Sequence, residues 1–235
     1  MKAFADLHIH SALSPCSDND MTPNNIVNMA YLKGLDIIAI TDHNSTENCR
    51  AVVDCGKKRG IVVVPGMELE TREEVHMVCL FPGVDEACKM QEIVYNALPD
   101  VENREDIFGQ QVMMDEEDNI KGYLKRLLLT ASNLSIDDAY LHVTSLGGVV
   151  IPAHIDRDSY SMISNLGIIP STPKMKYLEV SKGCDVEKFL ESNPYLKEFN
   201  LIRSSDAHTL GNILERESSI ELEELSIECL LSTLR

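Results

Sequence analysis

Short apolar runs alternate with segments of helical spacing along most of the chain. The runs that predict buried strands lie at residues 3–9, 35–41, 61–65, 75–81, 149–153, 177–180 and 199–204. Strands that alternate with helices in this way indicate a mainly parallel sheet, either open or closed into a barrel. The sequence therefore predicts an α/β fold.

Capping residues mark the starts of two predicted helices. Thr22-Pro23 is typical of an N-cap followed by proline at the first helical position, and Ser135 is a second N-cap. Helices are predicted at residues 24–33, 46–58, 85–98, 135–147 and 223–233.

The middle of the chain breaks the alternation. Residues 99–120 show no clear periodicity, and residues 120–133 return to helical spacing. We therefore expect residues 1–98 and 147–235 to form the barrel, and residues 99–146 to form a mostly helical insertion that caps one of its ends.

The composition is that of an ordinary globular protein. The 235 residues are 44% hydrophobic and 25% charged, enough for one α/β barrel or two small domains. No apolar run approaches the length of a membrane span, and Asp6, His8 and His10 interrupt the start, so no signal peptide is expected. The seven cysteines form no CxxC pair, which favours free thiols in a reducing compartment. We expect a cytoplasmic protein with no membrane partner.

The formal net charge of −17 restricts the expected partners. An acidic surface repels phosphate backbones, so binding to long nucleic acid is not expected. The chain has no tryptophan and only 5% aromatic residues, and the sequence shows no obvious platform for stacking bases. A small molecule is therefore the expected ligand.

Metal-binding residue types gather at the ends of the predicted strands. Asp6, His8 and His10 alternate along the first strand, so their side chains are expected to project from one face. Two imidazoles at a strand end favour metal ligation, with the Asp6 carboxylate fixing a ring tautomer. The alternative is a pair of surface histidines on an edge strand.

Two further motifs follow buried strands. Asp42 and His43 lie where ligands bind in α/β folds, although Asp42 alone is also typical of a helix N-cap. Glu68 and Glu70 share a face after the next strand, and a carboxylate there is able to bridge two cations because each oxygen binds one. Taken alone, this pair of acids would indicate a solvated turn.

The remaining histidines follow the same pattern. His76 begins one apolar run, His154 ends another, and Asp206 and His208 end a third. A single histidine at such a place is more often structural, but of the seven histidines only His142 lies within a helical pattern. This distribution is the strongest argument for a metal centre.

These motifs, in this order, resemble the PHP (polymerase and histidinol phosphatase) superfamily, over nearly the whole chain except residues 99–146. The resemblance implies a distorted (β/α)7 TIM-like barrel that binds two or three divalent ions, zinc, iron or manganese, at its carboxyl end. The matching segments are Asp6-Leu7-His8-Ile9-His10, Thr41-Asp42-His43-Asn44, Gly66-Met67-Glu68, His76, Pro152-Ala153-His154 and Ser205-Asp206-Ala207-His208.

The resemblance also implies how the ligands divide among the ions. The first ion would take His8, His10, Glu68 and Asp206; the second would share Glu68 with His76 and His154; the third would take His43, His208 and a ligand from the loop after His10.

The loop after His10 departs from the family's usual pattern. Cys16 matches the spacing of a histidine ligand in relatives, and Asp18 resembles an aspartate ligand with extra residues before it. A thiolate would favour zinc or iron over manganese or magnesium. A third ion held without Cys16, or only weakly, is an equal alternative.

The implied activity is hydrolysis of a small phosphate ester, a nucleotide or metabolite phosphomonoester, by a hydroxide that bridges the metals. The candidate catalytic residues are Glu68, Asp206 and His208, the last as a proton donor to the leaving oxygen. Asp6 and Asp42 would orient imidazoles from behind the ligands, with direct contact between Asp42 and a metal as the alternative.

Two loop cations are candidates for binding the substrate phosphate. Arg157 and Lys182 each follow a predicted strand closely, although an exposed surface cation is an equal interpretation for both. Arg203 alternates with Ser204 and Asp206, so it should point away from the site.

Three other functions stay open. A short-oligonucleotide exonuclease of the same family is one, because the ends of short strands carry less charge. An amidohydrolase-like metal hydrolase also uses His-x-His at a strand end, although the bridging lysine common in such sites has no match here. A non-catalytic metal-binding module is the third, and the nearly complete set of ligand positions disfavours it.

Overall fold

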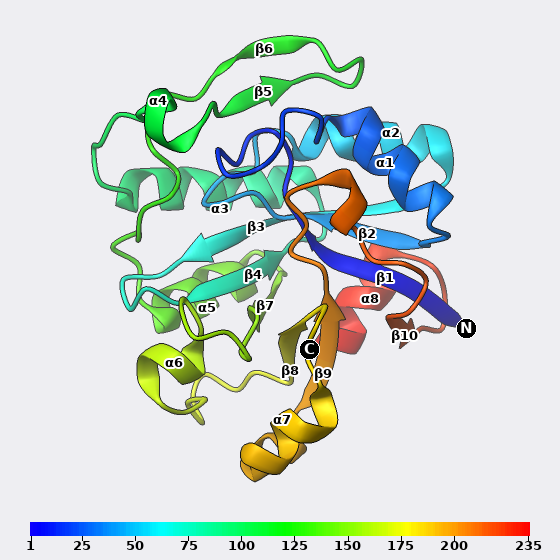
Figure 1. The fold of residues 1–235 in the computed structure, drawn as a ribbon, viewed down its shortest axis with the longest axis vertical. Coiled ribbons are helices and arrows are strands. Elements are labelled where there is room, and N and C mark those ends of the chain that lie inside the picture. Colours follow the sequence, from blue (N-terminus) through cyan, green and yellow to red (C-terminus); the bar gives the residue numbers. More distant parts are fainter.

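The computed structural model describes all 235 residues, and its main feature is a curled six-stranded sheet (Figure 1). The strand order is β10-β1-β2-β3-β4-β7, with β1, β2 and β3 parallel and the other pairs antiparallel. The strands are β1 (Lys2–Ile9), β2 (Ile37–Ile40), β3 (Val62–Glu70), β4 (His76–Leu80), β7 (Val149–Pro152) and β10 (Ser219–Glu221).

A separate parallel pair, β8 (Tyr177–Ser181) and β9 (Asn200–Ser204), lies across the opening of the curled sheet. Residues of β8 contact β7, and residues of β9 contact β1. A single parallel bridge, between Ile9 at the end of β1 and Ala207 after β9, links the pair to β1. On both sides of the pair the backbone makes only isolated hydrogen bonds, such as those from the Ile155 N–H to the Glu179 carbonyl and from the His10 N–H to the Ala207 carbonyl, rather than continuous strand pairing. The result is a curled half-barrel rather than the expected closed (β/α)7 barrel.

The antiparallel strand β4 is a second departure from the expected barrel. A tight turn joins it to β3, in which the Thr71 N–H donates to the Val75 carbonyl at 3.0 Å. This turn leaves no room for a helical crossover, and a parallel neighbour requires one. Glu68 and His76 consequently lie on adjacent antiparallel strands.

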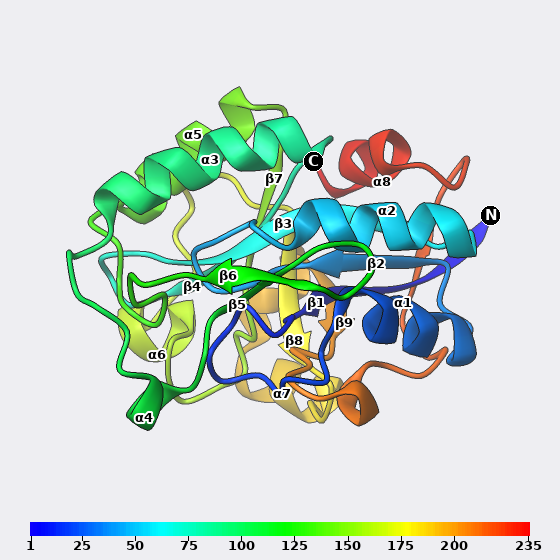
Figure 2. The same ribbon diagram turned by 90° about the horizontal axis from the view of Figure 1, so that it is seen from above.

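Helices pack against the sheet, and Figure 2 shows α3, α2 and α8 along one side of it. The Thr22 cap with proline at the first turn is confirmed, as is the Ser135 cap, where Ser135 and Asp138 form a capping box. The helices are α1 (Pro23–Leu32), α2 (Cys49–Arg59), α3 (Val84–Ala97), α4 (Glu105–Phe108), α5 (Ile136–Ser145), α6 (Met162–Leu166), α7 (Val186–Ser192) and α8 (Ile227–Leu234), with 3₁₀ turns η1 (Pro194–Glu198) and η2 (Leu210–Asn212).

The expected helix at residues 120–133 is wrong. This region contains a hairpin of β5 (Val112–Met114) and β6 (Ile120–Tyr123), followed by an extended segment. The side chain of Gln111 holds that segment extended, because it donates to the carbonyls of Leu124 and Arg126 and accepts from the N–H of Leu128. Leu127 and Leu128 are buried without forming a helix.

The hairpin is fastened to the elements that carry the first histidines. The Val112 N–H donates to the carbonyl of Ala12 at 2.9 Å, and Asn48 donates to the carbonyl of Val112 at 3.0 Å. Asp118 accepts from Thr22 and Asn24 at the start of α1. Residues 99–133 thus form a short helix, a hairpin and an extended segment that support the loop after β1, rather than a helical cap.

The interior of the curled sheet is filled by small and branched side chains. Ala5, Ala39, Val64 and Ala153 belong to one buried cluster, and Leu231 of α8 packs into it. This apolar filling lies toward the amino-terminal ends of β1 and β2. Polar side chains take over at the carboxyl ends, where the candidate site lies.

Candidate metal centre

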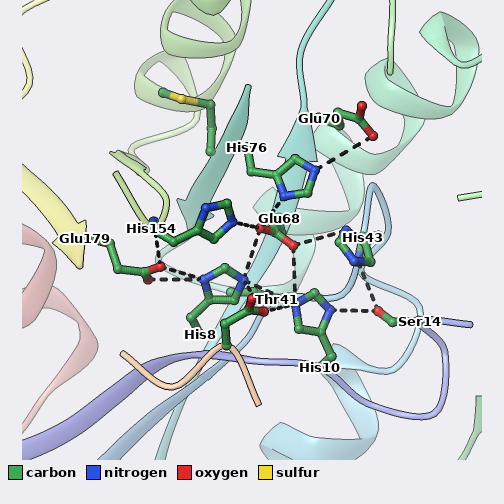
Figure 3. Close-up of polar contacts among 12 residues, drawn as sticks. His8, His10, Ser14, Thr41, His43, Glu68, Glu70, His76, His154 and Glu179 are labelled. Carbon is green, nitrogen blue, oxygen red and sulfur yellow. Dashed lines mark hydrogen bonds and ion pairs between the residues drawn. The ribbon is translucent and has the colours of Figure 1, made fainter. Parts of the chain in front are cut away.

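Six histidines and two carboxylates converge at one end of the sheet, and Figure 3 shows most of them. We call this set the Glu68 cluster: His8, His10, His43, Glu68, His76, His154, Asp206 and His208. The first two come from the end of β1, and the others follow β2, lie on β3 and β4, or follow β7 and β9. Strand ends that are far apart in sequence therefore bring together every histidine that the sequence singled out.

Glu68 lies at the centre of the cluster and is 1% exposed. Its Oε1 faces Nδ1 of His76 at 2.8 Å and Nε2 of His154 at 3.1 Å, as well as Nε2 of His8 at 3.3 Å. Its Oε2 faces Nδ1 of His43 at 3.0 Å and Nε2 of His10 at 3.3 Å. Each carboxylate oxygen thus faces its own group of imidazoles, as in a carboxylate that bridges two cations.

Asp206 contacts two of the same imidazoles, those of His8 and His10. Its Oδ1 lies 3.0 Å from Nε2 of His10 and 3.3 Å from Nε2 of His8. Its Oδ2 lies 2.6 Å from Nη1 of Arg157. The first pair of histidines is therefore enclosed between two acids.

The acids of the cluster remain ionised although they are buried. Burial raises the pKa of Glu68, but the imidazoles of His76, His8 and His43 outweigh it and hold that pKa well below its ordinary value. Burial likewise opposes ionisation of Asp206, and His8 and His10 keep its pKa low. The negative charge of both groups is thus available to cations.

The cluster fits divalent cations, because buried acceptor atoms are left without donors. Oε2 of Glu68, Oδ1 of Asp206 and Nδ1 of His154 are buried and lack a hydrogen-bond partner. Lone pairs that converge on carboxylate oxygens repel one another unless protons or cations lie between them. Histidine nitrogens and carboxylate oxygens are ligands of zinc, iron and manganese.

Three groups within the cluster have ligand atoms close enough to share one ion. They are His8, His10, Glu68 and Asp206; His43, Glu68 and His76; and His10, His43 and His208. The first equals the set expected for the first ion. The second contains His43 where His154 was expected, and the third contains His10 where a loop residue was expected.

Cys16 and Asp18 belong to none of these three groups. Cys16 is exposed, so its thiol is not enclosed among the ligand atoms of the cluster. The Asp18 N–H instead donates to the carbonyl of His208 at 2.9 Å, which ties this loop to the site through backbone atoms.

Glu179 is a site residue that the sequence reasoning missed. It lies on β8, is 2% exposed, and accepts from Nδ1 of His8 at 2.9 Å and 3.1 Å and from the N–H of His154 at 3.1 Å. The bond fixes the proton of His8 on Nδ1 and leaves Nε2 free to face the cluster. One acid within the otherwise apolar strand at residues 177–180 was the signal that could have identified it.

Replacing Glu179 with glutamine should weaken zinc binding by about 10–100-fold, because a neutral acceptor holds the His8 imidazole less firmly. Titration of the metal-free protein with zinc measures this change. Glu187→Gln on α7 is an exposed control and should bind zinc like the parent protein. Equal affinities for Glu179→Gln and the parent would show that Glu179 does not position His8.

His10 is oriented through a hydroxyl rather than directly by an acid. Its Nδ1 lies 2.9 Å from Oγ of Ser14, and that hydroxyl donates to Oδ1 of Asp42 at 2.7 Å. Because the hydroxyl proton is directed at Asp42, Ser14 accepts from the His10 ring. Asp42 therefore acts on the imidazole through Ser14, and it belongs to none of the metal groups.

The expectation that Asp6 orients an imidazole is wrong. Its carboxylate accepts from the N–H groups of Ser205 at 3.0 Å and Leu214 at 2.9 Å. The pairing of β1 with β2 shifts register between Asp6 and Ile9, so the simple alternation from Asp6 to His8 is broken. Asp6 instead holds the loop that carries Asp206.

His208 is half-buried and suits a ligand better than a proton donor. Its Nδ1 donates to the carbonyl of Asp206 at 2.9 Å, which leaves Nε2 as an acceptor. Burial and the neighbouring His10 lower its pKa to about 4. The ring is therefore neutral at pH 7 and holds no spare proton for a leaving group.

Two residues of the cluster have positive φ angles, which residues other than glycine rarely adopt. His154 has φ +29° and Asp206 has φ +50°. Such conformations cost about 1–3 kcal/mol each and persist where the surrounding structure imposes them. Both occur directly after a strand, at the points where the chain must turn a side chain into the cluster.

The two predicted phosphate-binding cations lie in different surroundings. Arg157 reaches Asp206 and is 42% exposed on its side chain, so its guanidinium lies at the edge of the cluster. Lys182 donates to the carbonyl of Asn212 at 3.2 Å and does not contact the cluster. Arg203 points away, as expected, and donates to the carbonyls of Ser181, Lys182 and Cys184.

A family model described as the PHP domain matches residues 6–164 of this chain. The chain belongs to the PHP domain family. The matched region includes five of the cluster's histidines, from His8 to His154, and ends before Glu179, Asp206 and His208. The fold nevertheless brings these three later residues to the same site.

Two curated relatives resemble part of the PHP domain. A 3′,5′-nucleoside bisphosphate phosphatase from Chromobacterium violaceum is 33% identical over 88 residues, which cover 36% of this chain and 29% of the relative. A 5′-3′ exoribonuclease from Haemophilus influenzae is 32% identical over 78 residues, or 32% and 27% of the two chains. Two other curated relatives are matched over 13% and 45% of their own length, so this chain spans less than half of each.

Endonuclease Q from Pyrococcus furiosus shares the fold, with a TM-score of 0.72 and 19% identity over 100% of this chain and 56% of that chain. Another structure of endonuclease Q holds a 27-mer duplex with an abasic lesion at the active site, with a TM-score of 0.70, 18% identity and the same coverage.

The expectation that excluded long nucleic acid is therefore wrong. A fold that covers all of this chain accommodates a DNA duplex in endonuclease Q. Net charge alone does not exclude such a ligand, because local charge decides whether a phosphate binds, and some of the acids, such as Glu68, are buried inside the cluster. None of the helices combines the length and the apolar character needed to cross a membrane.

Proposed function

We propose that this PHP protein is a metal-dependent phosphoesterase that hydrolyses a phosphomonoester of a nucleotide or another metabolite. The observation that carries the proposal is the position of Glu68, whose two oxygens each face separate imidazoles at 2.8–3.3 Å. Divalent cations bound there would supply Lewis acidity toward phosphate oxygens. The relatives named as a phosphatase and an exoribonuclease act, by their names, on phosphate esters.

The residues that would hold the cations follow from the three groups of ligand atoms. His8, His10, Glu68 and Asp206 would hold one ion, and His43 and His76 would hold a second with Glu68. His10, His43 and His208 would hold a third, with the neutral Nε2 of His208 as a ligand. Glu179 and Ser14 would keep the rings of His8 and His10 turned toward the ions.

Arg157 would bind the phosphate group of the substrate. Its guanidinium lies at the edge of the cluster and retains donors beyond the one directed at Asp206. A planar guanidinium matches two phosphate oxygens, and such charge-assisted bonds are stronger than neutral ones. The side chain would thus fix the phosphate against the cluster and offset its charge.

The test is phosphate release from a generic phosphomonoester in the presence of manganese, iron or zinc. Arg157→Ala should raise KM by about tenfold to a hundredfold, since a hydrogen bond to a charged group contributes about 1.5–3 kcal/mol. It should also weaken inhibition by inorganic phosphate to a similar extent.

Arg157→Lys keeps the charge but loses the paired donors, so its KM should lie between that of the parent and that of Arg157→Ala. A parent protein that releases no phosphate with any of these metals would contradict the proposed activity. A KM unchanged in Arg157→Ala would contradict the role of Arg157 alone.

A second candidate is hydrolysis at a nucleic acid. The similarity of the fold to endonuclease Q and of the sequence to an exoribonuclease favours it. An assay with 5′-labelled single-stranded and duplex oligonucleotides beside the phosphomonoester distinguishes the two candidates. Cleavage of the oligonucleotides with no release from the monoester would select the second.

A further inference from the structure

Tyr160 lies at the mouth of the Glu68 cluster, in the loop between β7 and α6. Its ring stacks on the ring of His76, with centroids 4.8 Å apart and an interplanar angle of 20°. The side of the phenol that does not contact His76 is open enough to leave the residue 47% exposed. A flat aromatic surface is thus presented to solvent directly beside the candidate metal ligands.

The chain holds Tyr160 in this position at a cost. The residue has φ +54°, a region that bulky side chains rarely occupy. Its carbonyl accepts from the His76 N–H at 2.9 Å, and the next residue, Ser161, is fully buried and caps α6. A strained conformation held by contacts on both sides is typical of a functional position.

Two contacts made by this one loop point to the two parts of a ligand. Arg157 reaches Asp206 on one side of the cluster, and Tyr160 covers His76 on another. A guanidinium suits a phosphate group, and an aromatic ring suits the face of a base. Apart from the imidazoles themselves, no other aromatic side chain stacks on a histidine of the cluster.

We propose that Tyr160 is a substrate-binding residue whose free ring face stacks on the nucleobase of a nucleotide held by the Glu68 cluster. This inference rests on the proposed function and specifies its substrate class. The base belongs either to a free nucleotide or to the terminal nucleotide of a strand, because both present the same ring. Stacking does not depend on charge, so it provides affinity in a chain whose net charge is −17. The sequence alone indicated no such platform, since an isolated tyrosine carries no pattern.

The test compares three substrates of the full chain with manganese: a nucleoside monophosphate, a short oligonucleotide with a terminal phosphate, and glycerol phosphate. Tyr160→Ala should lower kcat/KM for the base-containing substrate by about tenfold to a hundredfold, the range that base stacking supports. The same variant should lose much less activity on glycerol phosphate, which has no base to stack. Tyr160→Phe keeps the ring and should retain parent activity on every substrate, while thermal unfolding checks that both variants are folded.

The pattern of losses identifies the source of the base. A loss confined to the monophosphate supports a free nucleotide, and a loss confined to the oligonucleotide supports a strand end. An equal loss on glycerol phosphate, or no loss on any substrate, would overturn the role of Tyr160. If the parent releases no phosphate at all, the proposed activity fails, and calorimetric binding of the nucleoside monophosphate to the parent and to Tyr160→Ala then decides the inference separately.

Discussion

Replacing Glu68 with glutamine should lower the rate of phosphate release by about 10²–10³-fold, the loss that follows removal of one preorganised electrostatic group. Glutamine fills the same volume but carries no negative charge, and one of its two terminal atoms becomes a donor. Five imidazoles face this carboxylate at 3.3 Å or less, so the change affects two of the three candidate ion groups at once. Steady-state kinetics with manganese measures the rate, and elemental analysis should find fewer ions per chain.

The matched control is Glu70→Gln on the same strand. Glu70 is also buried, at 8% exposed against 1% for Glu68, but its carboxylate faces only Nε2 of His76, at 3.8 Å, so Glu70→Gln should lower the rate much less than Glu68→Gln. A general loss of a buried charge on β3 would affect both variants alike. Comparable activity of Glu68→Gln and Glu70→Gln would therefore contradict the central position of Glu68.

The histidines of the cluster could be predicted because strand ends meet in space. Each follows or begins an apolar run, and the carboxyl ends of adjacent parallel strands lie at one edge of a sheet. His43 and His154 are 111 residues apart in the sequence, yet both imidazoles face Glu68, at 3.0 Å and 3.1 Å. The pattern of apolar runs therefore located the cluster without any knowledge of the pairing order.

Residues that support the cluster were harder to predict, because their roles depend on geometry that no local pattern records. Asp6 was assigned to an imidazole on the assumption of regular alternation, and the register shift of β1 redirected it to the loop around Ser205. Glu179 was missed because one acid in a strand gives no motif, although the fold places it against His8.

The middle of the chain shows how side chains override local propensity. The spacing of Tyr123, Leu124, Leu127 and Leu128 matches a helix, and two of these residues are buried as a helix would bury them. The amide of Gln111 nevertheless binds three backbone groups of this segment and keeps it extended. The effect reaches the site, because the neighbouring Val112 pairs with Ala12 in the loop after His10.

Removing the divalent ions with a chelator should abolish phosphate release and lower the melting temperature by about 5–11 °C. The shift follows from about 2.7 kcal/mol of stabilisation at a ligand concentration of 100 Kd, and about 2–4 °C per kcal/mol for a chain of this size. Without cations, Oε2 of Glu68 and Oδ1 of Asp206 stay buried without a hydrogen-bond partner, and this arrangement opposes folding.

Adding back zinc, iron or manganese should restore both properties, whereas calcium should not, because calcium prefers sites built only from oxygen. Asp206→Ala gives the matched control: its melting temperature should respond much less to the chelator, since it lacks one ligand of the four-residue group. A chelated parent that keeps its rate would show that the cluster works without cations. A melting temperature that does not change would show that the imidazoles and carboxylates converge for a structural reason alone.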